Sequence, residues 1–113
     1  MGNCIFCDIA NGKMNTDLLY EDDQVVAFKD INPKAPVHFL IIPKEHIATI
    51  LDLEEENKQL LGHMYLVAKK LAKEYDIAEE GFRVVANCNE NGGQVVFHIH
   101  FHLLGGEKLG DIC

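Results

Sequence analysis

The sequence predicts an α+β domain in which a mainly antiparallel sheet of about five strands carries one long helix. Three strand-like segments come first, a segment with helical periodicity follows, and two more strand-like segments close the pattern. Strands grouped on either side of a single helix favour this class over a parallel sheet, in which strands and helices alternate. The length fits a single domain over residues 1–113, without a linker or an internal repeat.

The first three strands are expected between residues 18 and 43. LLYEDDQVVAFKD, residues 18–30, contains two short strands around a turn at Asp22 and Asp23. INPKAPV, residues 31–37, carries two prolines and predicts a loop. HFLIIP, residues 38–43, then predicts a mostly buried strand that ends at Pro43.

The long helix is expected to begin at Asp52 and to end before Gly81. Asp52 and Glu55 resemble a capping box, and the glutamates at 54–56 suit the positive end of a helix dipole. Apolar residues then recur at steps of three and four along one helix face: Leu60, Met64, Val67, Ala68, Leu71 and Tyr75.

The last two strands are expected in FRVVANC, residues 82–88, and VFHIHFHLL, residues 96–104. NENGG, residues 89–93, joins them as a tight, glycine-rich turn. The second strand therefore follows directly on a glycine turn, and it carries three of the six histidines of the chain.

Composition excludes some classes of partner. The net charge is −8, from 18 acidic and 10 basic residues, and no stripe of Lys and Arg offers a footprint for nucleic acid. No apolar run is long enough to span a membrane. The N-terminus has no basic segment ahead of a long apolar one, so we expect a cytoplasmic protein without a membrane partner.

The three histidines His98, His100 and His102 occupy alternate positions and should share one face of their strand. Same-face neighbours lie about 6.6–6.8 Å apart and the outer pair about 13 Å apart, whereas zinc–nitrogen bonds measure about 2.0–2.1 Å. One metal ion held by the three alone is therefore disfavoured. A solvent-exposed polar face is one alternative. The other is nucleophilic catalysis, in which a neutral imidazole attacks phosphorus and the glycine turn offers amides to the phosphate.

The segment HIHFHLL resembles the signature of the histidine triad (HIT) family, and the resemblance covers nearly the whole chain. FKDINPKAPVHFLIIPKEHI, LLGHMYLVAKKLA and RVVANCNENGGQVVFHIHFHLLGG are similar to the Hint branch, the purine nucleoside phosphoramidases. The resemblance implies the HIT fold, with a short N-terminal helix and a sheet that continues across a homodimer.

The resemblance also implies an activity and the residues that perform it. It implies hydrolysis of nucleoside 5′-phosphoramidates or related nucleoside monophosphate adducts through a nucleotidyl-histidine, with a purine nucleotide as ligand and no catalytic metal. His100 would be the nucleophile, His102 would contact the phosphate and the leaving group, and the backbone carbonyl of His98 would orient the ring of His100. Nucleotide-binding residues would be Asp30 and Ile31 at the ribose, Asn87, Gly93 and Gln94 at the phosphate, and Ile5, Phe6 and Ile9 at the purine.

Several of these nucleotide-binding residues have simpler interpretations. Asp30 precedes INP and suits a turn, and Asn87 suits a turn cap. Ile5, Phe6 and Ile9 suit an ordinary core.

The opening CIFCDIANGK resembles bacterial HIT proteins, some of which bind zinc. In this chain the ligands would be Cys4, Cys7, His46 and His98, and two thiolates with two imidazoles fit a closed, structural zinc site. A redox pair or inert thiols are the alternatives for a lone C-x-x-C. His38 and His63 receive no role from any motif.

Two departures from the Hint pattern leave other functions open. Val95 stands where Hint proteins often have a serine, and the sequence lacks their Trp-bearing C-terminal tail. These departures motivate one alternative, a non-catalytic nucleotide-binding protein. A dinucleoside polyphosphate hydrolase, as in the Fhit branch, is a second alternative, against which the Hint-like helix segment argues.

Overall fold

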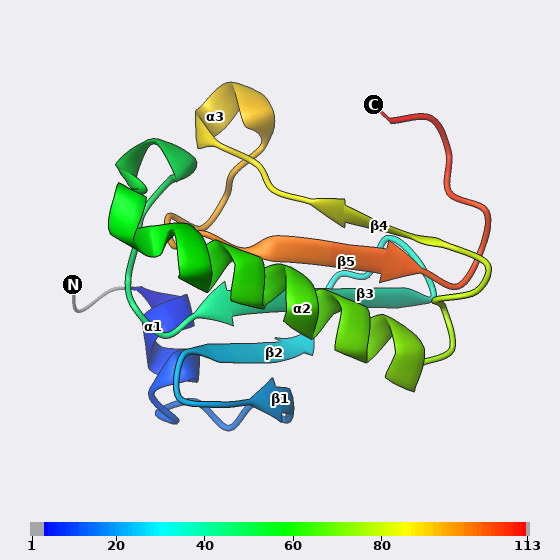
Figure 1. Ribbon diagram of the computed structural model, residues 1–113, viewed down its shortest axis with the longest axis horizontal. Helices are drawn as coiled ribbons and strands as arrows, with labels where there is room; N and C mark the ends of the chain where they lie inside the picture. The colour runs from blue at the N-terminus through cyan, green and yellow to red at the C-terminus, as the bar shows by residue number, and fades with distance from the viewer. Residues whose placement is uncertain (1–3, 113) are drawn as a thin grey trace.

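The computed structural model describes residues 4–112, which form a five-stranded antiparallel sheet, and so confirms the expected fold class (Figure 1). The spatial order is β1-β2-β3-β5-β4, and each neighbouring pair is antiparallel. The strands are β1 (Leu18–Glu21), β2 (Val25–Lys29), β3 (Val37–Pro43), β4 (Phe82–Val85) and β5 (Phe101–Gly105).

Each face of the sheet is covered by a different helix. The long helix α2 (Lys58–Glu74) runs across one face, and its apolar side packs with Val25 and Ala27 of β2 (Figure 1). The short helix α1 (Ile5–Ala10) packs with the alternate residues Val26 and Phe28. Because side chains alternate along a strand, β2 is buried on both faces and serves two separate cores.

The start of the long helix differs from the expectation. Thr49 and Asp52 form a capping box on a 3₁₀ turn (Ile50–Asp52), and a second 3₁₀ turn (Glu55–Asn57) follows it. Helix α2 then begins at Lys58 and ends at Glu74, well before Gly81. The predicted helix start at Asp52, with Glu55 as its capping partner, is therefore wrong: Thr49 binds the Asp52 carboxylate and closes a separate turn first.

The last two strands are shorter than predicted. β4 ends at Val85, whose partner on β5 is His102, so the ladder between these strands stops there. On its other side β5 pairs with β3 from Phe101 onward, and none of residues 96–100 takes part in this pairing. Residues 86–88 and 96–100 therefore lie outside the sheet. The turn between them is a one-turn helix, α3 (Asn89–Gly92). Gly93, with a left-handed φ of 90°, caps its C-terminus.

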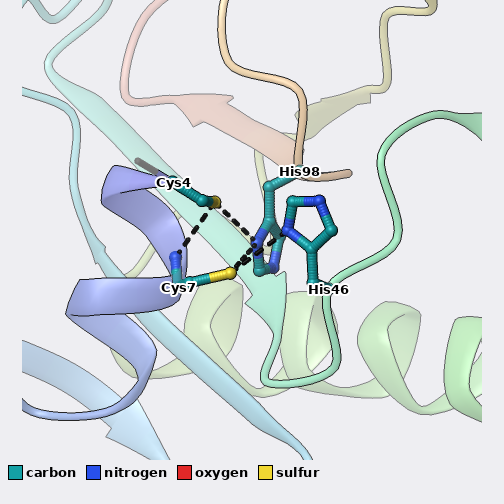
Figure 2. A group of neighbouring side chains, drawn as sticks. All are labelled: Cys4, Cys7, His46 and His98. Atoms are coloured by element: carbon teal, nitrogen blue, oxygen red, sulfur yellow. Dashed lines mark hydrogen bonds between the residues drawn. The ribbon is translucent and has the colours of Figure 1, made fainter. Parts of the chain in front are cut away.

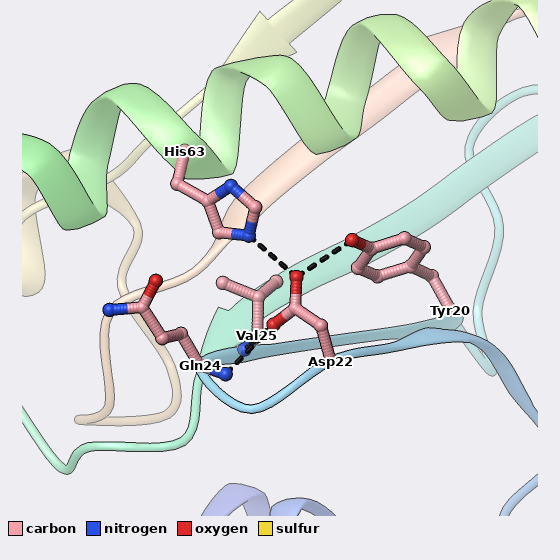
Figure 3. Close-up of polar contacts among 5 residues, drawn as sticks. All are labelled: Tyr20, Asp22, Gln24, Val25 and His63. Carbon is pink, nitrogen blue, oxygen red and sulfur yellow. Dashed lines mark hydrogen bonds and ion pairs between the residues drawn. The ribbon is translucent and has the colours of Figure 1, made fainter.

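A hydrogen-bonded group ties the β1–β2 turn to helix α2 (Figure 3). The Asp22 carboxylate accepts a hydrogen bond from the Tyr20 hydroxyl at 2.7 Å and from the backbone N–H groups of Gln24 and Val25, both at 2.8 Å. His63 reaches down from α2 to the same carboxylate. Burial by itself raises the pKa of the Asp22 carboxyl, but these hydrogen bonds outweigh burial and hold it well below its usual range. The hydrogen bond to Asp22 raises the pKa of Tyr20 to about 12.

Helices capable of spanning a membrane are absent between residues 4 and 112.

Candidate active site and metal centre

The three alternating histidines gather on the face of the sheet that carries α1. The rings of His100 and His102 lie 5.0 Å apart, and Phe6 of α1 meets His100 edge-on at 5.1 Å. Ile99, Phe101 and Leu103 point the other way, into the core beneath α2. The predicted alternation thus continues from β5 back to His98, although residues 98–100 have left the sheet.

His100 is held in one orientation by a backbone carbonyl. Its Nδ1 donates a hydrogen bond to the carbonyl oxygen of His98 at 2.8 Å, as the resemblance implies. A neutral imidazole carries one proton, so the lone pair is left on Nε2. Burial lowers the pKa of His100, and the hydrogen bond to His98 only partly opposes this. The ring is therefore neutral near pH 7, as a nucleophile must be.

His102 has a partner that sequence reasoning missed. Nδ1 of His102 lies 2.9 Å from Nε2 of His38, which in turn lies 3.4 Å from a carboxylate oxygen of Asp30. Burial, with His100 and His38 adding to it, lowers the pKa of His102 to about 4. The alternation of side chains along β3 could have indicated this contact. His38 lies on the same face of β3 as Leu40 and Ile42, which pack with α1, and this is the face that carries His102.

Cys4, Cys7, His46 and His98 converge from three segments of the chain (Figure 2). The cysteines lie at the start of α1, His46 follows β3, and His98 precedes β5. Nδ1 of His98 is 3.3 Å and 3.5 Å from the two sulfurs, and Nδ1 of His46 is 3.1 Å from Sγ of Cys7. Ligands of a tetrahedral zinc ion lie about 3.4–3.8 Å apart, given its bond lengths. The four side chains therefore fit a zinc ion with small adjustments.

The surroundings of the cluster suit metal binding. Nε2 of His98 donates to the carbonyl oxygen of Pro43 at 2.8 Å, which leaves the lone pair on Nδ1, the atom that faces the sulfurs. The backbone N–H of Cys7 donates to Sγ of Cys4 at 3.2 Å. Burial raises the pKa of the Cys7 thiol to about 11, so a metal ion would displace its proton on binding.

The residues expected around the ribose and the purine fall into two groups. Ile31 and Ile5 are exposed, at 92% and 47%, and are available to a ligand. Phe6 and Ile9 are buried and both belong to the core between α1 and the sheet, which favours the simpler interpretation, although Phe6 also meets the ring of His100 edge-on. Asp30 accepts the backbone N–H of Asn32 at 2.8 Å through one carboxylate oxygen, so it also closes a turn.

The residues expected around the phosphate meet at the glycine turn. A Cβ on Gly93 would lie 3.8 Å from the side-chain nitrogen of Asn87, so the two are neighbours. The Gln94 side chain is buried and bonds to backbone groups of Asn89, Ala48 and Val96. Gln94 thus braces the loop that leads to the histidines. Its neighbour Val95 is 85% exposed.

Comparison with known proteins places this arrangement in a family. The family described as "Scavenger mRNA decapping enzyme C-term binding" matches residues 3–111. The "Purine nucleoside phosphoramidase" of Escherichia coli is 50% identical over 106 residues, which cover 94% of this chain and 89% of that protein. An uncharacterised HIT-like protein of Buchnera aphidicola is 47% identical over 107 residues, covering 95% of this chain and 94% of that protein.

Solved structures agree with these matches. A HIT family hydrolase from Legionella pneumophila superposes with a TM-score of 0.95 at 48% identity, covering 97% of this chain and 98% of that one. A histidine triad protein from Clostridium difficile also has a TM-score of 0.95, at 44% identity, covering 98% of this chain and 96% of that one. The chain is therefore a member of the histidine triad (HIT) family of hydrolases.

Proposed function

We propose that the protein hydrolyses purine nucleoside 5′-phosphoramidates, or related nucleoside monophosphate adducts, through a covalent nucleotidyl-His100 intermediate. The observation that carries the proposal is the fixed ring of His100, whose Nδ1 donates to the carbonyl of His98 and whose Nε2 lone pair is available beside His102. The E. coli relative named "Purine nucleoside phosphoramidase" is 50% identical, which favours a phosphoramidate over a dinucleoside polyphosphate as the substrate.

The chemistry follows from the ring geometry. Nε2 of His100 forms a bond to phosphorus while the bond from phosphorus to the leaving nitrogen breaks, and the amine departs with the bonding electrons and takes up a proton. His102 hydrogen-bonds the phosphate and the leaving group. Water then forms a bond to phosphorus while the bond from phosphorus to Nε2 of His100 breaks, and the water releases a proton that balances the one taken up by the amine. The nucleoside monophosphate leaves, and neutral His100 is restored. No step uses a metal ion.

The nucleotide would lie against the α1 face. Asp30 would accept hydrogen bonds from the ribose hydroxyls, and the exposed Ile31 and Ile5 would contact the base and sugar. Asn87, Gly93 and Gln94 would line the phosphate position through the glycine turn. Phe6, which meets the ring of His100 edge-on, would wall the purine side of the site, and Ile9 would support it from the same core cluster.

We also propose a structural zinc ion, a homodimer and a cytoplasmic location. Cys4, Cys7, His46 and His98 would hold the zinc. The dimer would form along β4, which pairs on one side only within the described chain, together with the exposed Tyr65 and Leu66 of α2. Free thiols fit a reducing compartment, and the charge of −8 fits the absence of a nucleic-acid partner.

Incubation with an adenosine 5′-phosphoramidate tests the reaction. AMP should appear, and His100→Ala should abolish its release while leaving the circular dichroism spectrum and the melting temperature close to those of the wild type. Diadenosine triphosphate, run alongside, should be the slower substrate. AMP release that persists in His100→Ala would contradict the assignment, and AMP binding without any turnover would favour a non-catalytic nucleotide-binding protein.

A further inference from the structure

The ring of His38 is held by a backbone N–H at one nitrogen and by the ring of His102 at the other. It is buried at the start of β3, diagonal to His102, because His38 pairs with Leu104 and Leu40 pairs with His102. Its Nδ1 accepts a hydrogen bond from the backbone N–H of Lys34 at 3.0 Å. Its own backbone carbonyl accepts the N–H of Asp30 at 3.0 Å, which closes the β2–β3 loop around it.

The Lys34 amide decides which nitrogen of His38 carries the proton. A nitrogen that accepts a hydrogen bond has no proton of its own, and a neutral imidazole has exactly one N–H group. The proton of His38 must therefore be on Nε2. Nε2 faces Nδ1 of His102 at 2.9 Å and a carboxylate oxygen of Asp30 at 3.4 Å, and both of these atoms are acceptors for it.

His102 is restricted to one tautomer by His38. Two N–H groups cannot face each other at hydrogen-bonding distance, so Nδ1 of His102 must be the acceptor. The proton of neutral His102 is then on Nε2. One backbone amide in the β2–β3 loop thus sets the tautomers of two successive rings.

This arrangement also argues against a second metal site. Asp30, His38 and His102 are close enough together to be considered as ligands for an ion. A metal on Nε2 of His38 would need a lone pair there and would force a proton onto Nδ1. That proton would oppose the N–H of Lys34. The hydrogen-bonded chain satisfies both nitrogens of His38 and Nδ1 of His102, whereas the metal would leave an N–H of His38 without an acceptor.

We propose that the backbone N–H of Lys34, acting through His38, is a positioning group that makes His102 present an Nε2–H donor to the phosphate. The inference rests on the proposed function for its catalytic meaning. His100 and His102 then have opposite tautomers: His100 offers a lone pair at Nε2 and His102 offers a proton at Nε2. The pair can therefore attack phosphorus with one ring and hydrogen-bond its oxygens or leaving group with the next.

The tautomers can be read directly in the free protein. In ¹⁵N-histidine-labelled wild type, long-range ¹H–¹⁵N correlations should give Nε2 of His102 and of His38 the shifts of protonated nitrogens. The substitution Lys34→Pro removes the N–H, and His102 should then distribute its proton over both nitrogens. Lys34→Ala keeps the N–H and removes only an exposed side chain, so it should keep the wild-type pattern. A wild-type His102 protonated at Nδ1 would overturn the proposal.

A second pair of variants covers the case in which Lys34→Pro does not fold. The carboxamide in His38→Gln can accept from Lys34 and donate to His102, whereas the side chain in His38→Leu can do neither. His38→Leu should lower kcat about 10-fold or more, with a smaller change in KM, and His38→Gln should recover much of the loss. Equal kcat values in the Leu and Gln variants would overturn the inference.

Failure of the proposed function leaves a different result. If the protein releases no AMP from any phosphoramidate, the ¹⁵N pattern of the free protein still tests the Lys34–His38–His102 chain. If AMP is released but Lys34→Pro folds and leaves both the tautomer and kcat unchanged, the reaction stands and the role of Lys34 is refuted.

Discussion

Backbone groups decide the chemistry of the individual histidines. The carbonyl of Pro43 binds Nε2 of His98 and leaves Nδ1 facing the cysteines, and the carbonyl of His98 binds Nδ1 of His100 and leaves its lone pair on Nε2. The three rings have the same covalent structure but different hydrogen-bond partners, so their protons lie on different nitrogens, in the arrangement that the proposed roles need. The sequence alone predicts the alternation of these histidines, because alternation depends only on an extended chain. It does not predict their tautomers, which depend on atoms up to 64 positions away.

Asp30 provides a test of nucleotide binding at the residue scale. If its carboxylate binds the ribose hydroxyls, the wild type should prefer a ribonucleoside phosphoramidate to the 2′,3′-dideoxy analogue. Asp30→Asn should reduce that preference by about 10-fold or more, since hydrogen bonds to charged groups contribute about 1.5–3 kcal/mol. The measurement is kcat/KM for both substrates in both proteins. A preference unchanged in Asp30→Asn would place the ribose elsewhere.

At the scale of elements, the strands were easier to predict than the ends of the helix. β2 and β3 are apolar runs bounded by turn residues, and the structure places them within one residue of the prediction at most of their ends. The predicted start of α2 is wrong because two other capping boxes form in this segment. Asp52 pairs with Thr49 on one 3₁₀ turn, and Glu54 pairs with Asn57 on the next, in place of the expected pair Asp52 and Glu55.

The predicted last strand is too long because its pairing stops at Phe101 on the β3 side and at His102 on the β4 side, although β3 itself continues to Pro43. No local sequence pattern records where pairing between distant segments stops.

The proposed zinc ion would stabilise the fold, because its bonds would join the cysteines at the start of α1 to His46 and His98. Protein purified without added metal should contain about one zinc per chain, and Cys7→Ser should lose most of it. A ligand present at 100 times its Kd stabilises a folded protein by about 2.7 kcal/mol. If zinc binds this tightly, its loss should lower the Tm of this protein by roughly 10 °C. Metal analysis and thermal melts, with and without chelator, measure both effects.

Cys88→Ser is the matched control for the zinc site, because Cys88 lies outside the cluster. It should keep its zinc and its Tm. A wild-type protein without zinc, or a Cys7→Ser variant that retains a full equivalent, would contradict the four-ligand site.

The Asp22 group should make the attachment of α2 dependent on pH. The folded-state pKa of Asp22 is held below its unfolded value of about 3.9, so its contribution is complete above that value and falls as the pH drops toward the folded-state pKa. Asp22→Asn should lower the unfolding free energy at pH 7 by about 1–3 kcal/mol, and the difference should shrink on acidification. Urea unfolding from pH 7 to pH 3 measures it.

Asp23→Asn is the control for that experiment, since it removes an exposed neighbouring carboxylate. It should leave stability nearly unchanged over the same range. An Asp22→Asn deficit that does not depend on pH would show that the ionised carboxylate is not the source of the stabilisation.

At the scale of the whole molecule, the proposed dimer would use the edge strand β4 and the exposed apolar residues of α2. Tyr65 and Leu66 are 56% and 61% exposed, and Phe82 at the start of β4 is 39% exposed. Sedimentation should give twice the chain mass of 12.7 kDa. Leu66→Glu should shift the protein toward monomer, because a buried unpaired charge is costly at an interface. Met14→Glu, an exposed apolar residue on the segment after α1, should remain dimeric. Wild-type sedimentation as a monomer would contradict the dimer.

The central claim is that His100 becomes covalently nucleotidylated during turnover. Rapid quenching of the wild type with an adenosine phosphoramidate, followed by mass spectrometry of the intact chain and its peptides, tests it directly. The account predicts an acid-labile adduct of one adenylyl group on the peptide that contains His100, formed and lost at rates consistent with kcat and absent in His100→Ala. An adduct on another residue, or steady turnover in which no adduct forms under conditions that trap it, would contradict the account.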